Sequence, residues 1–227
     1  MTSRTARILV LAGRGRYEDP WHDHAATSYR VALALTELRL AVEIRSTFPD
    51  AFTNLDAFDL IVVNSGDGRI DPEFDGDDAR WTPAHAALHE YASAGRPVLG
   101  LHQAAMTFCD SPYWHRILGG RWVPDTSMHP PWGMARFDVA SDHPIVAGLG
   151  LVEALDERYS FLEVLPGSQP LLTQRHDGID HPVVWVNTAG PYRCVYDALG
   201  HTVDSYDSLS RLALLRREVL WLLGRDD

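Results

Sequence analysis

Three short stretches of this chain are almost continuously apolar, and they limit the folds that it can adopt. They cover residues 7–12, 59–64 and 97–101. A half-exposed strand alternates apolar and polar residues, whereas a strand buried on both faces of a parallel sheet is apolar throughout. Residues 25–38 have apolar side chains at helical spacing, and residues 41–45 are typical of another strand. Because a strand, helix, strand order requires a crossover, the sequence predicts an α/β fold with a mostly parallel sheet.

The third apolar stretch runs through small residues into a segment of helical character. Its sequence, Gly100-Leu101-His102-Gln103-Ala104-Ala105, is similar to the sharp strand-to-helix turn that presents a nucleophile above the sheet of hydrolases. The presented residue here is His102. Imidazole at such a turn is better suited to be an acid, a base or a ligand than a nucleophile. Since ligands bind beyond the carboxyl ends of parallel strands, we expect a binding site at His102.

Other elements follow from the same patterns. Thr82 and Pro83 have the chemistry of a helix N-cap and first turn, which predicts a helix over residues 82–93. Further strands are expected at residues 134–140, 171–175, 183–187 and 193–198, and an amphipathic helix at residues 208–223. No linker or repeat at a fixed period divides the chain, so we expect one domain over residues 1–227.

The last predicted helix has an apolar stripe. Its members are Leu212, Leu214, Leu215, Val219 and Leu222. Such a stripe packs on the sheet of its own chain or, if it stays uncovered, joins copies of the chain. The first interpretation is favoured, and a homo-oligomer is the alternative.

The net charge and the cysteine content limit the classes of partner and the cellular compartment that we expect for this protein. The formal net charge of −11 argues against nucleic acids and anionic membranes, which both require a basic face. The acidic loop at residues 67–78 lacks the full calcium-loop pattern and is expected to be solvated. Cys109 and Cys194 have neither CxxC spacing nor the density of a disulfide scaffold. No apolar run approaches the ~18 residues of a membrane span, and residues 1–6 lack a signal peptide's apolar segment. These features predict a soluble, cytoplasmic protein.

Six motifs follow one another along the chain. They are Gly100-Leu101-His102, Leu118-Gly119-Gly120, His143-Pro144-Ile145, Asp156-Glu157-Arg158-Tyr159, the strand at residues 182–185, and Leu199-Gly200-His201. This ordered set resembles the ThuA-like family, named for trehalose utilisation, over nearly the whole chain. The resemblance implies a class I glutamine amidotransferase-like fold, a flavodoxin-like three-layer α/β sandwich. It also implies a carbohydrate partner, a sugar or keto-sugar met in the use of trehalose and related disaccharides.

The resemblance does not imply amidotransfer. Glutamine amidotransferases have a cysteine at the elbow and a histidine after a later strand, with a carboxylate two residues further on. This chain has His102 at the elbow and His201 at the later position, followed by Thr202 and Val203. Without a thiolate, a glutaminyl thioester cannot form.

Eight polar and aromatic side chains are candidates for a site at this edge of the sheet. We expect catalytic roles for His102, Glu157 and His201, and substrate-binding roles for His22, His24, His129, Trp132 and Tyr159. Imidazole and carboxylate groups exchange protons near neutral pH. A tryptophan beside polar groups suits the apolar face of a sugar.

Each candidate also has a purely structural interpretation. His102 could stabilise its own turn, and His201 could cap a helix or a loop. Glu157 could pair with Arg158 or with a neighbouring arginine. Three further tryptophans, Trp21, Trp114 and Trp122, are expected in the core or in an interface.

Three hypotheses for function remain open. In the first, Glu157 and one histidine act as base and acid on a sugar. In the second, His102, His201 and a third ligand from His24, His129 or Glu157 hold a divalent metal such as zinc. In the third, the protein is a non-catalytic sugar-binding or regulatory module. The sequence does not decide, because a metal site here would be assembled from distant strands.

Overall fold

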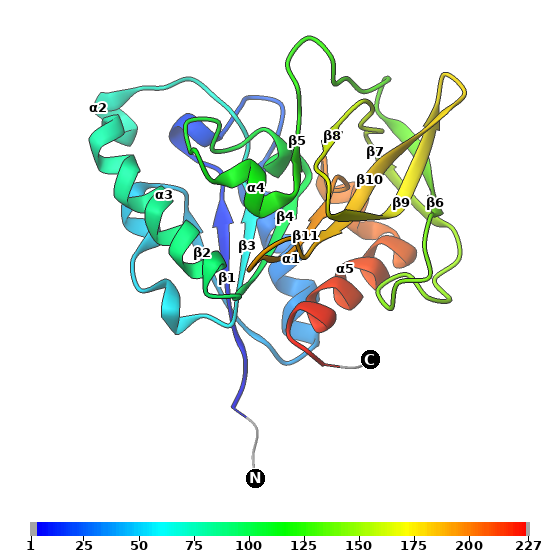
Figure 1. Cartoon of the computed structure of the whole chain (residues 1–227), viewed down its shortest axis with the longest axis horizontal. Helices are drawn as coiled ribbons and strands as arrows, with labels where there is room; N and C mark the ends of the chain where they lie inside the picture. Colours follow the sequence, from blue (N-terminus) through cyan, green and yellow to red (C-terminus); the bar gives the residue numbers. More distant parts are fainter. Residues whose placement is uncertain (1–3, 226–227) are drawn as a thin grey trace.

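One nine-stranded sheet organises the computed structural model, which describes residues 4–225 (Figure 1). The strand order is β2-β1-β3-β4-β11-β10-β9-β6-β7. The parallel half contains β2 (Ala41–Ser46), β1 (Arg7–Ala12), β3 (Leu60–Asn64), β4 (Pro97–Leu101) and β11 (Arg193–Asp197). The antiparallel half contains β10 (Ile179–Asn187), β9 (Ser168–His176), β6 (Gly133–Val139) and β7 (Val152–Asp156).

The three apolar stretches are neighbouring strands at the centre of the parallel half. β1, β3 and β4 are almost entirely buried, which explains why their sequences lack polar alternation. β2 lies at the edge of the sheet and is largely accessible. The carboxyl ends of β1, β3, β4 and β11 therefore meet at one edge of the sheet.

Helices cover both faces of the sheet, which gives three layers. α1 (His24–Glu37) and α5 (Leu209–Leu222) contact each other and cover one face, while α3 (Asp78–Ser93) and α4 (Trp114–Leu118) cover the other. The remaining short elements are η1 (Gly15–Tyr17), η2 (Pro49–Phe52), η3 (Leu55–Ala57), α2 (Pro72–Asp75), η4 (His102–Ala105), η5 (Val203–Asp207), and the pair β5 (Gly120–Arg121) and β8 (Glu163–Val164). The predicted α/β sandwich is thus confirmed, and the sheet is parallel in its first half.

Two local predictions are wrong. α3 begins at Asp78 rather than near Thr82, because Asp77 is the N-cap and its carboxylate accepts from the Arg80 N–H. Pro83 therefore lies inside the helix. The acidic loop is not uniformly solvated either, since Asp75 is buried and pairs with the buried Arg16 guanidinium at 3.0 Å.

The apolar stripe of the last helix packs within the chain. Leu214, Leu215, Val219 and Leu222 are buried in the core, and α5 contacts β4, β7 and β11. The stripe therefore supplies no reason for contact between copies. No helix among residues 4–225 has the length and apolarity of a membrane span.

Candidate functional site

His102 lies where β4 turns sharply into η4. Its φ of +47° falls in the left-handed region that residues other than glycine rarely adopt. The Tyr196 hydroxyl supports this turn by donating to the His102 carbonyl oxygen at 2.8 Å. Gly100 leaves room for Leu118 just before the turn, because a Cβ there would lie 2.4 Å from Leu118 Cδ1. The imidazole is held at the sheet edge and is only 2% exposed.

Four side chains from distant parts of the chain converge at this edge. His22 follows β1, His102 follows β4, Glu157 follows β7 and His201 follows β11. One ring nitrogen of each histidine and one carboxylate oxygen of Glu157 all lie within 4.8 Å of one another. We call these four residues the His/Glu cluster. Glu157 Oε2 is 3.4 Å from His102 Nε2 and 4.0 Å from His22 Nε2.

Hydrogen bonds outside the cluster orient two of its imidazoles. The Nδ1 of His102 lies 2.7 Å from the Ala198 carbonyl oxygen. Because a carbonyl only accepts, Nδ1 carries the proton, and the Nε2 lone pair of the neutral ring faces the cluster. The Nδ1 of His22 lies 2.8 Å from the carboxylate of Asp19, which likewise leaves Nε2 directed inward. Metal-binding histidines are commonly held by a carbonyl or carboxylate in this way.

Three atoms of the His/Glu cluster have no hydrogen-bond partner. Within residues 4–225, His22 Nε2, Glu157 Oε2 and His201 Nδ1 are buried and form no hydrogen bond. Glu157 Oε2 and His201 Nδ1 have only wider contacts, at 3.4 Å to His102 Nε2 and at 3.5 Å to Glu157 Oε1. A buried polar atom without a hydrogen-bond partner destabilises the folded state by about 1–3 kcal/mol. Three such atoms directed at the same point therefore need a physical explanation. A bound cation would give all three a partner.

The local environment sets the protonation of the cluster. Burial lowers the pKa of His201 to about 4, so its ring is neutral at physiological pH. Burial raises the pKa of Glu157, but the neighbouring His102, with smaller effects from His201 and His129, outweighs burial and leaves this pKa below its usual value. Burial also lowers the pKa of His102, yet Glu157 and Asp156 outweigh it and the net pKa is raised.

Asp156 fixes two members of the cluster through its buried carboxylate. It accepts from the backbone N–H of Gly200 at 2.8 Å, of His201 at 3.1 Å and of Glu157 at 2.9 Å. The Ser205 hydroxyl donates to the same carboxylate. The segments that carry Glu157 and His201 are therefore held together as one unit, which we call the Asp156 clasp.

A cavity of about 600 Å³ opens onto the cluster, and we call it the His/Glu cleft. It is lined by Asp19, Trp21, His22, Asp67, Gln103, Met106, His129, Glu157 and His201. Its volume is in the range of small-molecule sites.

Three of the predicted binding residues lie around the cluster. Tyr159 is buried, and its hydroxyl is 3.2 Å from His102 Nε2. His129 is partly exposed, and its Nδ1 is 3.5 Å from Glu157 Oε1. The Trp132 ring lies 6.3 Å from the His201 ring and is 43% exposed.

His24 and Trp21 lie on either side of His22. His24 is buried at the start of α1, where its ring stacks on His22 at 5.9 Å, and it lines an adjoining cavity with Trp21 and His22 rather than the His/Glu cleft. Trp21 was expected in the core or an interface but is 76% exposed and lines the cleft. Trp114 is buried and Trp122 packs against Tyr159, as expected for core aromatics.

The sequence did not single out Asp19 or Gln103. The Gln103 side-chain amide donates to Asp19 at 2.6 Å, and Asp19 in turn holds His22. Burial raises the pKa of Asp19, but hydrogen bonds from His22 and Gln103 lower it to about 2. The available signals were the Asp19-x-x-His22 spacing and the position of Gln103 directly after the elbow histidine.

Neither cysteine can supply the nucleophile that an amidotransferase needs. Cys194 is buried within β11, and burial raises its thiol pKa above the usual range. Cys109 lies beyond η4 and reaches the surface, but partial burial of its thiol and the charge of Asp67 raise its pKa to about 11. Both thiols are therefore protonated and unreactive near pH 7.

A three-layer sandwich with a strained turn after β4 and polar groups at the strand ends defines a protein of the class I glutamine amidotransferase-like fold. A glutamine amidotransferase from Thermotoga maritima superposes with a TM-score of 0.62 at 10% identity, covering 97% of this chain and 99% of that one. The sequence matches the family ThuA, described as trehalose utilisation, over residues 7–222. The chain belongs to this family.

Two solved structures of ThuA-like proteins are more similar still. One from Parabacteroides merdae has a TM-score of 0.76 at 17% identity, covering 98% of this chain and 91% of that one. One from Bacteroides uniformis has a TM-score of 0.77 at 17% identity, covering 100% of this chain and 95% of that one. The TM-scores of these two superpositions show that the proteins share the fold of this chain. No curated protein matches the sequence.

Proposed function

We propose that this protein is an enzyme that acts on a sugar or keto-sugar with the help of a divalent metal ion, such as zinc, bound by the His/Glu cluster. The observation that carries the proposal is the convergence of four donor atoms, three of them buried without a hydrogen bond. Most buried polar atoms in proteins have a hydrogen-bond partner, because leaving them without one costs stability.

The donor set fits a transition metal. Imidazole nitrogens and a carboxylate suit zinc and its first-row neighbours. Zinc binds nitrogen at about 2.0–2.1 Å in a tetrahedral arrangement, so two of its donors are about 3.3–3.4 Å apart. The donor atoms of the cluster lie within 4.8 Å of one another, so binding an ion would draw the side chains inward. The neutral His201 and the ionised Glu157 are also the protonation states that bind metal.

The residues of the cluster and its rim divide the chemistry between them. A bound divalent ion would polarise a carbonyl or acidify a water molecule. Burial raises the pKa of Tyr159 well above its usual range, so its hydroxyl is a proton donor that lies 3.2 Å from His102 Nε2. His129 contacts Glu157 from the partly exposed rim, where it can exchange protons with solvent.

A carbohydrate substrate is supported by the family description and by the cleft. The family is described as trehalose utilisation. Trp21 and Trp132 present accessible indole surface near the cluster, and such surface stacks on the apolar face of sugar rings. Keto-sugars also have an acidic proton beside the carbonyl, which acid and base groups can move.

One observation favours a metal-free alternative. The raised pKa of His102 and the lowered pKa of Glu157 describe an acid and a base 3.4 Å apart. In that version the pair transfers protons directly. Chelation separates the two mechanisms, because it abolishes turnover only if the ion takes part.

Metal binding is measured on the full chain after dialysis against a chelator. Calorimetric titration with zinc chloride is expected to show one ion per chain, and His201→Ala and Glu157→Gln are each expected to weaken binding at least tenfold. His176→Ala is the matched control, because His176 lies at the end of β9 and pairs with Asp177. Equal zinc binding by the parent and by Glu157→Gln would overturn the metal assignment.

Turnover is then assayed on glucose, trehalose and the keto-sugars obtained by oxidising one ring hydroxyl of each. The expected result is turnover by the metal-loaded parent and its loss on chelation. Turnover that survives chelation supports the metal-free pair. Binding of sugar with unchanged affinity in Glu157→Ala, and no turnover by any form, would instead identify a binding module.

A further inference from the structure

The four residues of the His/Glu cluster do not all face the His/Glu cleft. His22, Glu157 and His201 line it, whereas His102 is only 2% exposed and is not part of its wall. The same three lining residues carry the atoms of the cluster that form no hydrogen bond in residues 4–225. The Nε2 of His102 differs, because the Tyr159 hydroxyl lies 3.2 Å from it. An ion that enters from the cleft therefore meets three donor atoms without a hydrogen bond before it meets His102.

Both ring nitrogens of His102 already have a partner. Its Nδ1 donates to the Ala198 carbonyl oxygen at 2.7 Å, so its Nε2 accepts from the Tyr159 hydroxyl. Tyr159 is buried, and within the described part of the chain its hydroxyl has no other hydrogen-bond partner. If His102 Nε2 bound an ion, this buried hydroxyl would be left without an acceptor, which destabilises the folded state. The lone pair of His102 is therefore used within the protein.

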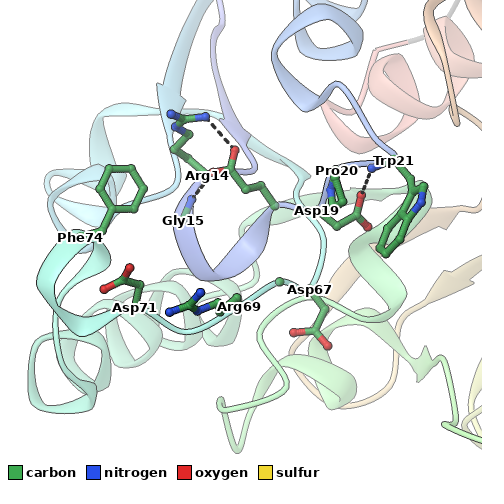
Figure 2. A pocket seen from close by; sticks show the side chains of 11 residues that line it. Arg14, Gly15, Asp19, Pro20, Trp21, Asp67, Arg69, Asp71 and Phe74 are labelled. Atoms are coloured by element: carbon green, nitrogen blue, oxygen red, sulfur yellow. Dashed lines mark hydrogen bonds and ion pairs between the residues drawn. The ribbon is translucent and has the colours of Figure 1, made fainter.

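His22 is held in the opposite way, with its inner nitrogen unused. The Asp19 carboxylate lies 2.8 Å from His22 Nδ1. This carboxylate is fixed in turn, because it accepts from the Gln103 side-chain amide at 2.6 Å and from the Trp21 backbone N–H at 2.9 Å (Figure 2). No group in residues 4–225 forms a hydrogen bond with His22 Nε2. The imidazole is therefore oriented before an ion arrives, as is usual for a metal-binding histidine.

Glu157 and His201 complete a set of three donors around one space. The Asp156 clasp holds these two residues together, and His201 Nδ1 is 3.5 Å from Glu157 Oε1. The other carboxylate oxygen, Glu157 Oε2, is 4.0 Å from His22 Nε2. Two imidazoles and one carboxylate are a ligand set of catalytic zinc, which keeps a fourth position for water or substrate, whereas structural zinc has four protein ligands. The arrangement therefore matches a metal site of the open kind.

We propose that the metal ion is bound by His22, Glu157 and His201 alone, and that its fourth position stays open toward the His/Glu cleft and takes one oxygen or nitrogen donor from there. His102 is a positioning residue instead of a ligand. Its Nε2 lies 3.4 Å from Glu157 Oε2 and its ring packs on Tyr159 at 4.8 Å, so it limits the movement of this carboxylate. This proposal rests on the proposed function, because it takes the His/Glu cluster as the metal site.

NMR identifies the ligands in the full chain, labelled with ¹⁵N-histidine and loaded with ¹¹³Cd as a substitute for zinc. A ring nitrogen that binds ¹¹³Cd shows a scalar coupling to it. The expected couplings are at His22 Nε2 and His201 Nδ1, with none at His102. His22→Asn is expected to remove the first coupling, and the matched variant His102→Asn is expected to keep both. Asparagine adopts the left-handed φ of His102 more readily than most residues, so this variant retains the turn.

Cobalt(II) tests the open position, because its visible absorption depends on the number and type of its ligands. Azide is the added donor. It is expected to shift the absorption of the cobalt-loaded parent and of cobalt-loaded His102→Asn by similar amounts, with chelator-treated protein as the control. Zinc titration is expected to show that His22→Asn weakens binding at least tenfold, and more than His102→Asn does.

The outcomes separate this proposal from the proposed function. Couplings at His22 Nε2 and His201 Nδ1 alone, together with an azide shift, support the proposal. A coupling at His102 Nε2 overturns the set of three ligands and leaves the metal-dependent function standing. An absorption that does not change at saturating azide overturns the open position. Failure of cadmium, cobalt and zinc to bind the parent overturns both proposals.

Discussion

Replacing Asp19 with asparagine tests whether His22 is a metal ligand held from behind. The two carboxylate oxygens lie 2.8 and 3.0 Å from His22 Nδ1, and one of them also accepts from Gln103 at 2.6 Å. Asparagine keeps one oxygen but turns an amide N–H₂ toward one of these donors. It also removes the charge that makes the imidazole a stronger ligand.

The expected loss follows from what such supporting residues contribute elsewhere. Removing the hydrogen-bond partner of a metal-binding histidine typically lowers metal affinity about 10–100-fold, which corresponds to about 1.4–2.8 kcal/mol. Competition with a chromogenic zinc chelator at pH 7.5 measures this change directly. Asp23→Asn is the matched control, because Asp23 is the N-cap of α1 and asparagine caps a helix equally well.

One result would contradict a supporting role for Asp19. If folded Asp19→Asn, with a thermal midpoint like that of the parent, binds zinc within twofold of the parent, then Asp19 does not support a ligand. Loss of affinity in both Asp19→Asn and Asp23→Asn would point to a general disturbance of the loop before α1.

Two further predictions concern the fold. Gly100→Ala is expected to destabilise the protein by about 1–3 kcal/mol in urea unfolding, because the new Cβ would lie 2.4 Å from Leu118 Cδ1; an unchanged midpoint would show that the elbow relaxes freely. Buried Glu218 has a pKa raised by burial and by the charge of Asp197, so the folded state holds it protonated. Its favourable contribution is present below the usual carboxyl pKa and is lost as the pH rises through the raised value. Glu218→Gln is therefore expected to gain stability over the parent more at pH 8 than at pH 5, and equal differences at both values would contradict this.

The parallel half of the fold could be predicted because its central strands are buried on both faces and are therefore almost entirely apolar in sequence. β1, β3 and β4 have to be apolar on both faces, so each is visible on its own. The carboxyl ends of parallel strands also lie at the same edge of the sheet, so the residues that follow these strands lie at that edge too. His102 and His201 could therefore be expected near each other before any contact was known.

Other parts depend on contacts that leave little local trace. β7 is a short strand at the sheet edge with alternating burial, and no pattern in Val152–Asp156 separates it from a loop. Glu157, which follows it, was reached only through the family resemblance. Trp21 lies in a loop without periodicity, so its exposure could not be predicted. The start of α3 was placed too late because Thr82 and Pro83 are typical of an N-cap and a first turn. The actual N-cap is Asp77, five residues before Thr82.

The Asp156 clasp also determines when the cluster can exist during synthesis. His22, His102 and Glu157 leave the ribosome early, but the clasp closes only on the backbone of Gly200 and His201. A nascent chain that stops before this point has at most three donors, and its Glu157 is not anchored to the segment that brings the fourth. A metal ion bound as proposed would therefore be held by all its donors only in chains that have been translated and folded past β11.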